Sequence, residues 1–202
     1  MDVTTPPLWL LTAPRGAGKS TRAGALADAA RAAGWDVAGL LSPAVFTAGA
    51  KTGIAAQNLR SGETRLLARV APAPTFDLEM SNWHFDRSVF VWGNQILEAS
   101  LPCDLFIVDE LGPLELRRNE GWVTALPALR RAQYNLGLVV IRPELVAAAR
   151  TLLPIRDILP LPETLPPGDS GLAYIQQLAE RSRIEIPPGI IRYLSNNLKG
   201  DQ

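Results

Sequence analysis

The sequence predicts an α/β fold in which helices flank a mostly parallel, twisted β-sheet, with an antiparallel β-meander inserted into it. The 202 residues are 47% hydrophobic, which allows a substantial core. Apolar runs of strand length alternate with longer helical stretches, as in βαβ units. Between about residues 43 and 70 the pattern changes to short strand-like runs separated by glycine turns. We expect a single domain over residues 1–202.

The first βαβ unit is expected near the amino end. Residues 8–11 form an apolar run of strand length, residues 20–33 are rich in alanine and read as a helix, and Gly34 stands where that helix would end. Residues 35–42 then read as a second core strand.

The rest of the chain continues the alternation after the meander. Asp86 could cap a helix that runs to about Ser100, and Pro127 is expected to kink or divide a later helix. The meander either widens the sheet edge or grips a substrate. The expected elements are meander strands at 44–47, 53–59 and 64–70, a loop at 71–75, helices at 86–100, 119–134, 170–183 and 188–198, core strands at 104–111 and 136–141, and a possible edge strand at 155–159.

A phosphate-binding loop is predicted between the first strand and the first helix. The segment fits the P-loop pattern G-x-x-x-x-G-K-[ST] except at its first position, where Ala13 replaces glycine. Glycines allow backbone N–H groups to point inward at phosphate oxygens, and the helix start adds its free N–H groups. Lys19 would contact the outer phosphates, and the Ser20 hydroxyl would bind Mg²⁺. The residues expected to bind nucleotide are Ala13, Pro14, Arg15, Gly16, Ala17, Gly18, Lys19, Ser20 and Thr21.

Two carboxylates end the strand predicted at 104–111. The carboxyl ends of parallel strands meet at the crevice where such sheets bind ligands. Asp109 would complete the Mg²⁺ shell, and Glu110 would orient and deprotonate the attacking water. Lys19 and Glu110 are therefore the expected catalytic residues, and Ser20 and Asp109 the expected metal ligands.

Two arginines are candidates for stabilising charge on the transferred phosphate. Arg142 ends a predicted strand and precedes Pro143, so it could reach the γ-phosphate or form a salt bridge. Arg15 lies inside the loop itself. Residues 83–86, Trp-His-Phe-Asp, could supply a base-stacking surface, but a hydrophobic staple at a helix start is the favoured interpretation.

Composition excludes several classes of protein. Twenty basic and twenty acidic residues give a net charge of zero, which argues against a nucleic-acid or anionic-membrane surface. The single cysteine, Cys103, cannot form an internal disulfide, and the start lacks signal-peptide features. The single histidine, His84, cannot form a metal cluster. We expect a cytoplasmic protein with a nucleoside triphosphate substrate, and neither nucleic acid nor membrane as partner.

These motifs together resemble the small P-loop nucleoside-triphosphatases of the cancer-related or thermophile type. The resemblance rests on the loop at 13–21, on the segment 42–67 with its Lys-Thr-Gly-Ile run, and most specifically on Val-Asp-Glu-Leu-Gly-Pro-Leu-Glu at 108–115. It covers the chain to about Arg150. It implies slow, Mg²⁺-dependent hydrolysis of ATP, GTP and other triphosphates with little base selectivity, with Asp109 and Glu110 as the Walker B pair.

Two other functions compete with hydrolysis. A nucleotide or small-molecule kinase needs an arginine-rich lid over the phosphates, and Arg117 and Arg118 are a slight basis for one. An ATP-gated regulatory protein would use hydrolysis to reset a partner interaction. The sequence lacks an Asn-Lys-x-Asp guanine-reading motif, which disfavours a GTP switch.

Overall fold

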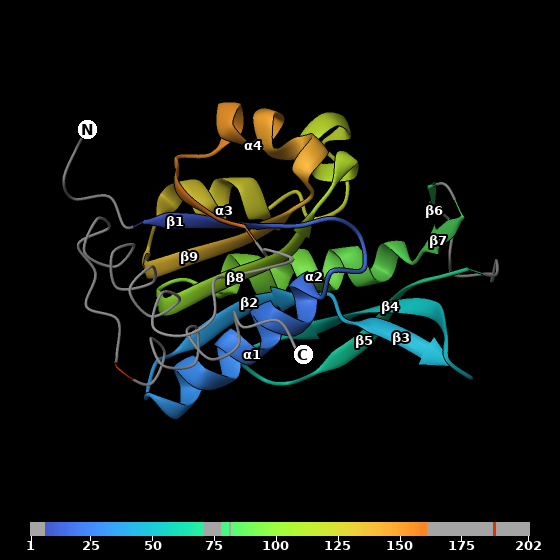
Figure 1. Cartoon of the computed structure of the whole chain (residues 1–202), viewed down its shortest axis with the longest axis horizontal. Helices are drawn as coiled ribbons and strands as arrows, with labels where there is room; N and C mark the ends of the chain where they lie inside the picture. Colours follow the sequence, from blue (N-terminus) through green and yellow to red (C-terminus); the bar gives the residue numbers. More distant parts are fainter. Residues whose placement is uncertain (1–6, 71–77, 81, 161–187, 189–202) are drawn as a thin grey trace.

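The computed structural model describes residues 7–70, 78–80, 82–160 and 188, and these ranges contain one ten-stranded sheet with helices on both faces (Figure 1). The helices expected at 170–183 and 188–198 lie outside the described residues, apart from Pro188. The elements, in chain order, are β1 (Leu8–Thr12), α1 (Lys19–Ala32), β2 (Val37–Leu41), β3 (Ala44–Thr47), β4 (Ala50–Asn58), β5 (Thr64–Arg69), β6 (Leu78–Met80), β7 (Trp83–Phe85), α2 (Arg87–Ala99), β8 (Cys103–Leu111), the π-helical turn η1 (Leu114–Arg118), α3 (Ala125–Arg131), β9 (Tyr134–Ile141), the 3₁₀ turn η2 (Pro143–Leu145), α4 (Val146–Leu152) and β10 (Ile155–Pro160).

The strand order explains how distant parts of the sequence meet. The order is β10-β1-β9-β8-β2-β4-β5-β7-β6, with β3 paired to β4. The first five strands in this order are mutually parallel. β9 therefore lies between β1 and β8, and the carboxyl ends of all three strands share one edge of the sheet. The expected mostly parallel core is confirmed, and the edge strand expected at 155–159 is present as β10.

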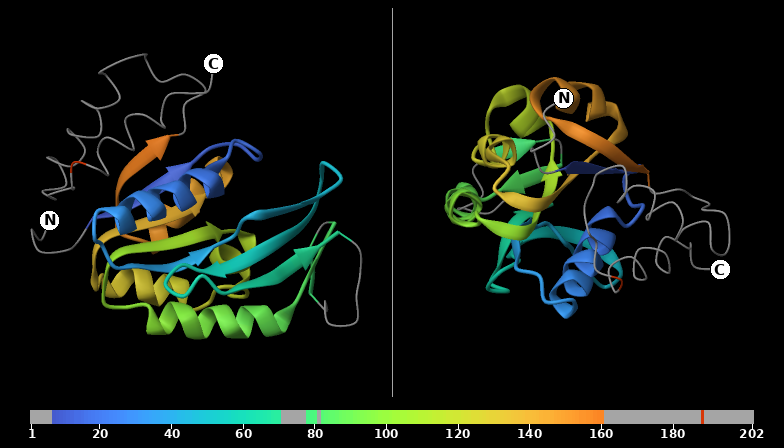
Figure 2. Two further views of the ribbon diagram at one scale, coloured as in Figure 1. Left: turned by 90° about the horizontal axis from the view of Figure 1, so that it is seen from below. Right: turned by 90° about the vertical axis from the view of Figure 1, so that its left-hand side faces the viewer.

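The parallel strands are buried on both faces because helices cover both. In β1, Leu8 and Leu10 join the core under α2, α3 and α4, whereas Trp9 and Leu11 join the core under α1. Figure 2 shows α1 on one side of the sheet and α2 with α3 on the other. A strand that is covered by helices on both faces has a continuous run of apolar residues, and such runs are what predicted these strands.

The inserted meander is confirmed as antiparallel. β4 pairs antiparallel with β2, β3 and β5, and β7 continues the antiparallel part of the sheet beside β5. The β3–β4 hairpin extends past the parallel strands at the end where α1 begins (Figures 1 and 2). The meander therefore widens the sheet, as one of the two interpretations expected.

The helix predicted at 119–134 is wrong in its extent. Only Ala125–Arg131 is helical, and Tyr134 already belongs to β9. Asn119 and Gly121 adopt left-handed conformations, with φ of 52° and 73°, which an α-helix cannot contain. Pro127 is the third residue of α3, where its missing N–H would have no helical partner, so it neither kinks nor divides a helix.

The start of α2 bears out the predicted staple. The Asp86 side chain accepts a hydrogen bond from the Ser88 nitrogen and caps the helix. Phe85, just before the cap, stacks on Phe90 with ring centroids 5.7 Å apart. Trp83 lies instead under the ammonium of Lys51, 5.3 Å from the ring centroid.

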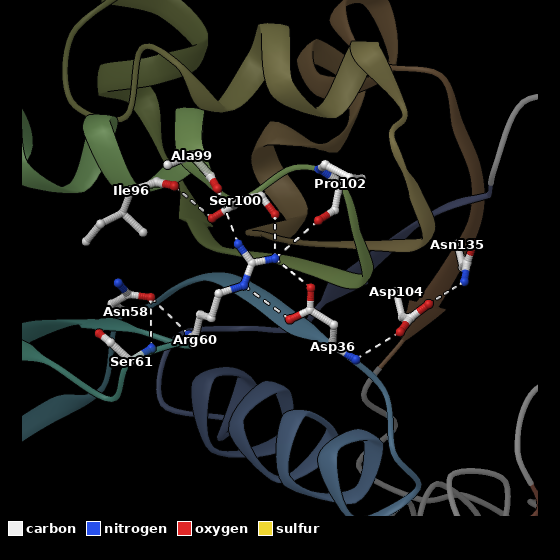
Figure 3. Close-up of polar contacts among 10 residues, drawn as sticks. All are labelled: Asp36, Asn58, Arg60, Ser61, Ile96, Ala99, Ser100, Pro102, Asp104 and Asn135. Carbon is white, nitrogen blue, oxygen red and sulfur yellow. Dashed lines mark hydrogen bonds and ion pairs between the residues drawn. The ribbon is translucent and has the colours of Figure 1, made fainter.

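A polar network ties the opposite, amino-terminal edge of the parallel strands together (Figure 3). Arg60 forms two bonds to the Asp36 carboxylate and also donates to the main-chain oxygens of Ala99, Ser100 and Pro102. Asp104 accepts from the Asp36 nitrogen. This network fixes the turn after β4 to the end of α2 and is remote from the phosphate loop.

None of the helices in the described residues is both long and apolar enough to cross a membrane.

Candidate active site

The loop between β1 and α1 adopts a conformation that its glycines make possible. Gly16 and Gly18 have φ of 79° and 77°, in the left-handed region, and Gly18 caps α1. Ala13 is buried and does not adopt a positive φ, so alanine at the first motif position introduces no backbone strain. Residues 14–17 are exposed, which leaves the loop accessible to a ligand.

Lys19 is the first residue of α1, and its side chain folds over the loop. Its ammonium donates to the main-chain oxygens of Ala13 at 2.8 Å and Pro14 at 2.9 Å. Burial lowers the pKa of Lys19, while the negative charges of Glu110 and Asp109 raise it and the positive charge of Arg142 lowers it further. The acids predicted from β8 therefore lie within electrostatic range of the loop lysine.

Asp109 is fully buried at the end of β8. Its Oδ2 accepts a 3.0 Å hydrogen bond from the Ser42 nitrogen, and its main-chain oxygen accepts one from the Ser42 hydroxyl. Burial raises the pKa of Asp109 to about 6, although the hydrogen bonds from Ser42 and from the Ser20 side chain act in the opposite direction. The Ser20 side chain therefore lies near the Asp109 carboxylate.

Glu110 lies at an irregularity in the pairing of β8 with β9. Asp109 pairs with Val140 and Leu111 with Ile141, so Glu110 is an extra residue on β8. Bulges of this kind redirect side chains and are frequent beside active sites. The Glu110 carboxylate accepts a hydrogen bond from Nε of Arg142, and both side chains are about three-quarters buried.

The two candidate arginines differ in position. Arg142 follows β9, the strand between β1 and β8, and its guanidinium binds Glu110 inside the site. The salt bridge expected as one alternative is therefore present, and its partner is the predicted catalytic acid. Arg15 is exposed on the loop, and the structure shows no bond from it to Asp109 or Glu110.

Glu115, the last residue of the 108–115 motif, has a structural role that its motif did not predict. Its carboxylate is 6% exposed and accepts hydrogen bonds from the Gly112 nitrogen at 2.7 Å and the Trp122 nitrogen at 3.0 Å. Burial raises the pKa of Glu115, and these two N–H groups oppose the rise. A buried carboxylate that accepts two N–H bonds closes the segment after Glu110 into a fixed loop. The signal available in the sequence was the position of Glu115 between Gly112 and the Gly121–Trp122 pair.

Ser20 and Asp109 fit a magnesium ion. Oδ1 of Asp109 is buried and, within the ranges that the structure describes, has no hydrogen-bond partner, so it has a lone pair available in addition to the nearby Ser20 hydroxyl. Hard oxygen ligands of this kind suit Mg²⁺, which keeps several waters and binds phosphate oxygens as well. No cluster of three or more His, Cys, Asp or Glu that could enclose a metal occurs in the described residues, so a metal here would depend on non-protein oxygens too.

A glycine loop that joins a buried strand to a helix, facing carboxylates at the carboxyl end of a parallel strand, defines the class of P-loop nucleotide-binding proteins. Within this class the chain belongs to the family described as NTPase, which matches residues 9–146.

Several relatives carry the name nucleoside-triphosphatase THEP1. The chain is 34% identical to the protein from Methanothermobacter thermautotrophicus over 112 residues, which are 55% of this chain and 63% of that protein. It thus spans less than two thirds of that relative. It is 31% identical to the protein from Ignicoccus hospitalis (64% of this chain, 69% of the relative) and 30% identical to the one from Pyrococcus abyssi (68% and 75%).

Two solved structures share the fold. A human cancer-related nucleoside triphosphatase superimposes with a TM-score of 0.60 at 19% identity, covering 89% of this chain and all of that one. THEP1 from Aquifex aeolicus gives a TM-score of 0.60 at 16% identity, covering 86% and 99%. The predicted fold class is therefore confirmed.

Proposed function

We propose that this protein is a Mg²⁺-dependent nucleoside-triphosphatase that hydrolyses ATP, GTP and other nucleoside triphosphates to diphosphates and phosphate with low base selectivity. The observation that carries the proposal is the convergence of Lys19 with Asp109, Glu110 and Arg142 at one edge of the sheet. Membership of the NTPase family and three relatives named nucleoside-triphosphatases support it.

Each part of the site has a proposed task. The N–H groups of residues 15–18 and of the start of α1 would bind phosphate oxygens, since these N–H groups carry partial positive charge. Lys19 would exchange its bonds to the Ala13 and Pro14 oxygens for bonds to the outer phosphates. Ser20 and Asp109 would hold Mg²⁺, which when bound neutralises charge on the β- and γ-phosphates.

Glu110 is the proposed general base. Glu110 directly follows Asp109 in the sequence, but the two side chains differ in environment. Asp109 is fully buried, whereas the Glu110 side chain is 24% exposed. A partly exposed carboxylate can take a proton from a water molecule and return it to solvent. An acid directly beside the metal ligand suits water attack, which favours hydrolysis over transfer to an acceptor.

The proposed low base selectivity is supported by the absence of any proposed contact to the base. The proposed contacts all go to phosphates or metal, and the sequence contains no Asn-Lys-x-Asp motif.

The experiment that tests the proposal is a phosphate-release panel with ATP, GTP, CTP and UTP plus Mg²⁺ and no acceptor. Turnover of several triphosphates is expected. Glu110→Gln should reduce kcat by about 10²- to 10⁴-fold while retaining nucleotide binding. The exposed Glu98→Gln variant in α2 is the matched control and should turn over normally.

A second variant tests the phosphate loop. Lys19→Ala should weaken triphosphate binding by about 10- to 100-fold, because charge-assisted bonds to phosphate are lost. Lys51→Ala, which removes a lysine beside Trp83, is its control. Unchanged affinity for Lys19→Ala would contradict the assigned loop. Phosphate transfer only to an added acceptor would indicate a kinase, and turnover only with a partner protein would indicate a gated regulator.

A further inference from the structure

Arg142 and Glu110 form a specific pair inside the site. Nε of Arg142 donates to Oε1 of Glu110, and the two side chains are 23% and 24% exposed. The residues come from the ends of adjacent parallel strands, β9 and β8, which places the pair on a rigid part of the sheet. A charge-assisted hydrogen bond between partly buried groups fixes orientation more firmly than an exposed surface pair does.

The Glu110 side chain needs such a partner. Glu110 is the extra residue at the β8 irregularity, so its main chain is not held by a register partner on β9. A glutamate side chain also has three rotatable bonds, and ordering it carries an entropy cost. Across the described residues, Arg142 is the partner that fixes this carboxylate.

The second carboxylate oxygen of Glu110, Oε2, is available to bind a water molecule. Arg142 engages Oε1 through Nε, and within the described residues Oε2 of Glu110 accepts no bond. A carboxylate held at one oxygen can still accept a hydrogen bond from water at the other. β9 lies between the strands that carry the phosphate loop and the acids, so Arg142 orients Glu110 from the middle of the site.

We propose that Arg142 is a positioning residue that holds Oε1 of Glu110 so that Oε2 faces the attacking water. This inference rests on the proposed hydrolase function. It assigns to Arg142 an effect on the chemical step through Glu110, rather than a direct bond to the γ-phosphate.

The test is a double-mutant cycle of Arg142→Gln and Glu110→Gln in the full chain. Arg142→Gln should lower kcat for ATP by about 10²-fold, the order expected when a reacting group is misplaced by about 1 Å. Its KM and its ratio of ATP to ADP affinity should stay as in wild type. In the Glu110→Gln background the same change should lower kcat no further, because the group that Arg142 positions is already absent.

Matched variants sharpen the result. Arg142→Lys should recover only part of kcat, since lysine keeps the charge but not the planar donor. The exposed Arg150→Gln variant in α4 should behave as wild type. Loss of ATP affinity relative to ADP in Arg142→Gln, or a further loss of kcat in the Glu110→Gln background, would show a direct phosphate contact and overturn the inference.

A structural readout does not depend on turnover. Crystal structures of wild type and Arg142→Gln should show Glu110 in one rotamer in the first and dispersed in the second. An unchanged Glu110 rotamer in Arg142→Gln would contradict positioning. If wild type hydrolyses ATP, Glu110→Gln does not and Arg142→Gln does so normally, the inference is overturned and the hydrolase function stands. An inactive wild type would instead count against the hydrolase function itself.

Discussion

Ser42 holds Asp109 through two hydrogen bonds: its nitrogen donates to Oδ2 at 3.0 Å, and its hydroxyl donates to the Asp109 main-chain oxygen. Ser42 directly follows β2, and Asp109 lies near the end of the neighbouring strand β8. The pair therefore locks two parallel strands together where the candidate metal ligand emerges.

Ser42→Ala should destabilise the protein modestly. It removes the hydroxyl bond but keeps the N–H bond to the carboxylate, so we expect a loss of about 1 kcal/mol in the free energy of unfolding. Ser42→Thr retains a hydroxyl and serves as the control. Denaturant unfolding of the three proteins measures the difference, and equal stability of Ala and Thr variants would show that the hydroxyl bond contributes little.

Asp109→Asn should raise stability and abolish metal-dependent turnover. The wild-type carboxylate is fully buried with one unpaired oxygen, which is unfavourable by roughly 1–3 kcal/mol. The neutral amide avoids burying that charge, and its oxygen can still accept from Ser42. Thermal unfolding without Mg²⁺, paired with phosphate release, gives both readouts.

Asp104→Asn is the contrasting control for this change. Asp104 is partly exposed and accepts bonds from the Asp36 nitrogen and from the Asn135 amide. Removing its charge should lower stability, because it weakens charge-assisted bonds without removing a fully buried charge. A gain in stability for Asp104→Asn equal to that for Asp109→Asn would contradict the burial argument.

Gly121→Ala should be strongly destabilising because two effects add. Gly121 has φ of 73°, and a Cβ there would lie 2.1 Å from Oε1 of Glu115. The left-handed conformation disfavours alanine by roughly 1–2 kcal/mol, and the clash would displace the carboxylate that holds Gly112 and Trp122. We expect a total loss above about 3 kcal/mol, with reduced activity.

The Gly62→Ala variant measures the loss of stability that is due to the backbone conformation alone. Gly62 has φ of 78°, and a Cβ there would meet no atom within 4 Å. It should therefore lose only about 1–2 kcal/mol. Similar losses for the two variants in urea unfolding would show that Glu115 moves freely and does not fix the loop.

Cys103 should be unreactive in the native protein near neutral pH. Burial raises the pKa of its thiol to about 12 from 9.0, and Asp36 and Asp104 add to the rise while Arg60 opposes it. The thiolate is the reactive form, so native alkylation at pH 8 should be about 10³-fold slower than in the urea-unfolded chain. Mass spectrometry of iodoacetamide-treated samples measures this, and equal rates would contradict it.

The same shift gives a pH dependence of stability. Because the folded pKa lies above the unfolded one, the thiol's contribution is fully present below about pH 9 and is lost as pH rises toward 12. Cys103→Ser removes the titrating group. The stability of wild type relative to this variant should fall between pH 9 and 11.

Local sequence patterns were sufficient to predict a feature when all the residues that form it lie in one short segment. The glycines of the phosphate loop have the left-handed conformations that the motif requires, and the Phe85–Phe90 staple follows from spacing about the Asp86 cap. The helix expected at 119–134 was wrong because its residues satisfy helical periodicity, yet the Glu115 carboxylate holds the Trp122 nitrogen outside a helix. A partner seven residues away overrode local propensity.

Residue types alone were enough to infer the phosphate loop, the acidic strand end and the parallel core, because each depends on a short, fixed spacing. Contacts between residues of different strands became apparent only in the folded protein. The order β1-β9-β8 places Arg142 on Glu110, and the junction of β2 with β8 places Ser42 on Asp109. Strand order depends on packing of the whole sheet. The partners in these two contacts are 32 positions apart for Arg142 and Glu110 and 67 positions apart for Ser42 and Asp109, so they could be paired only once the fold was known.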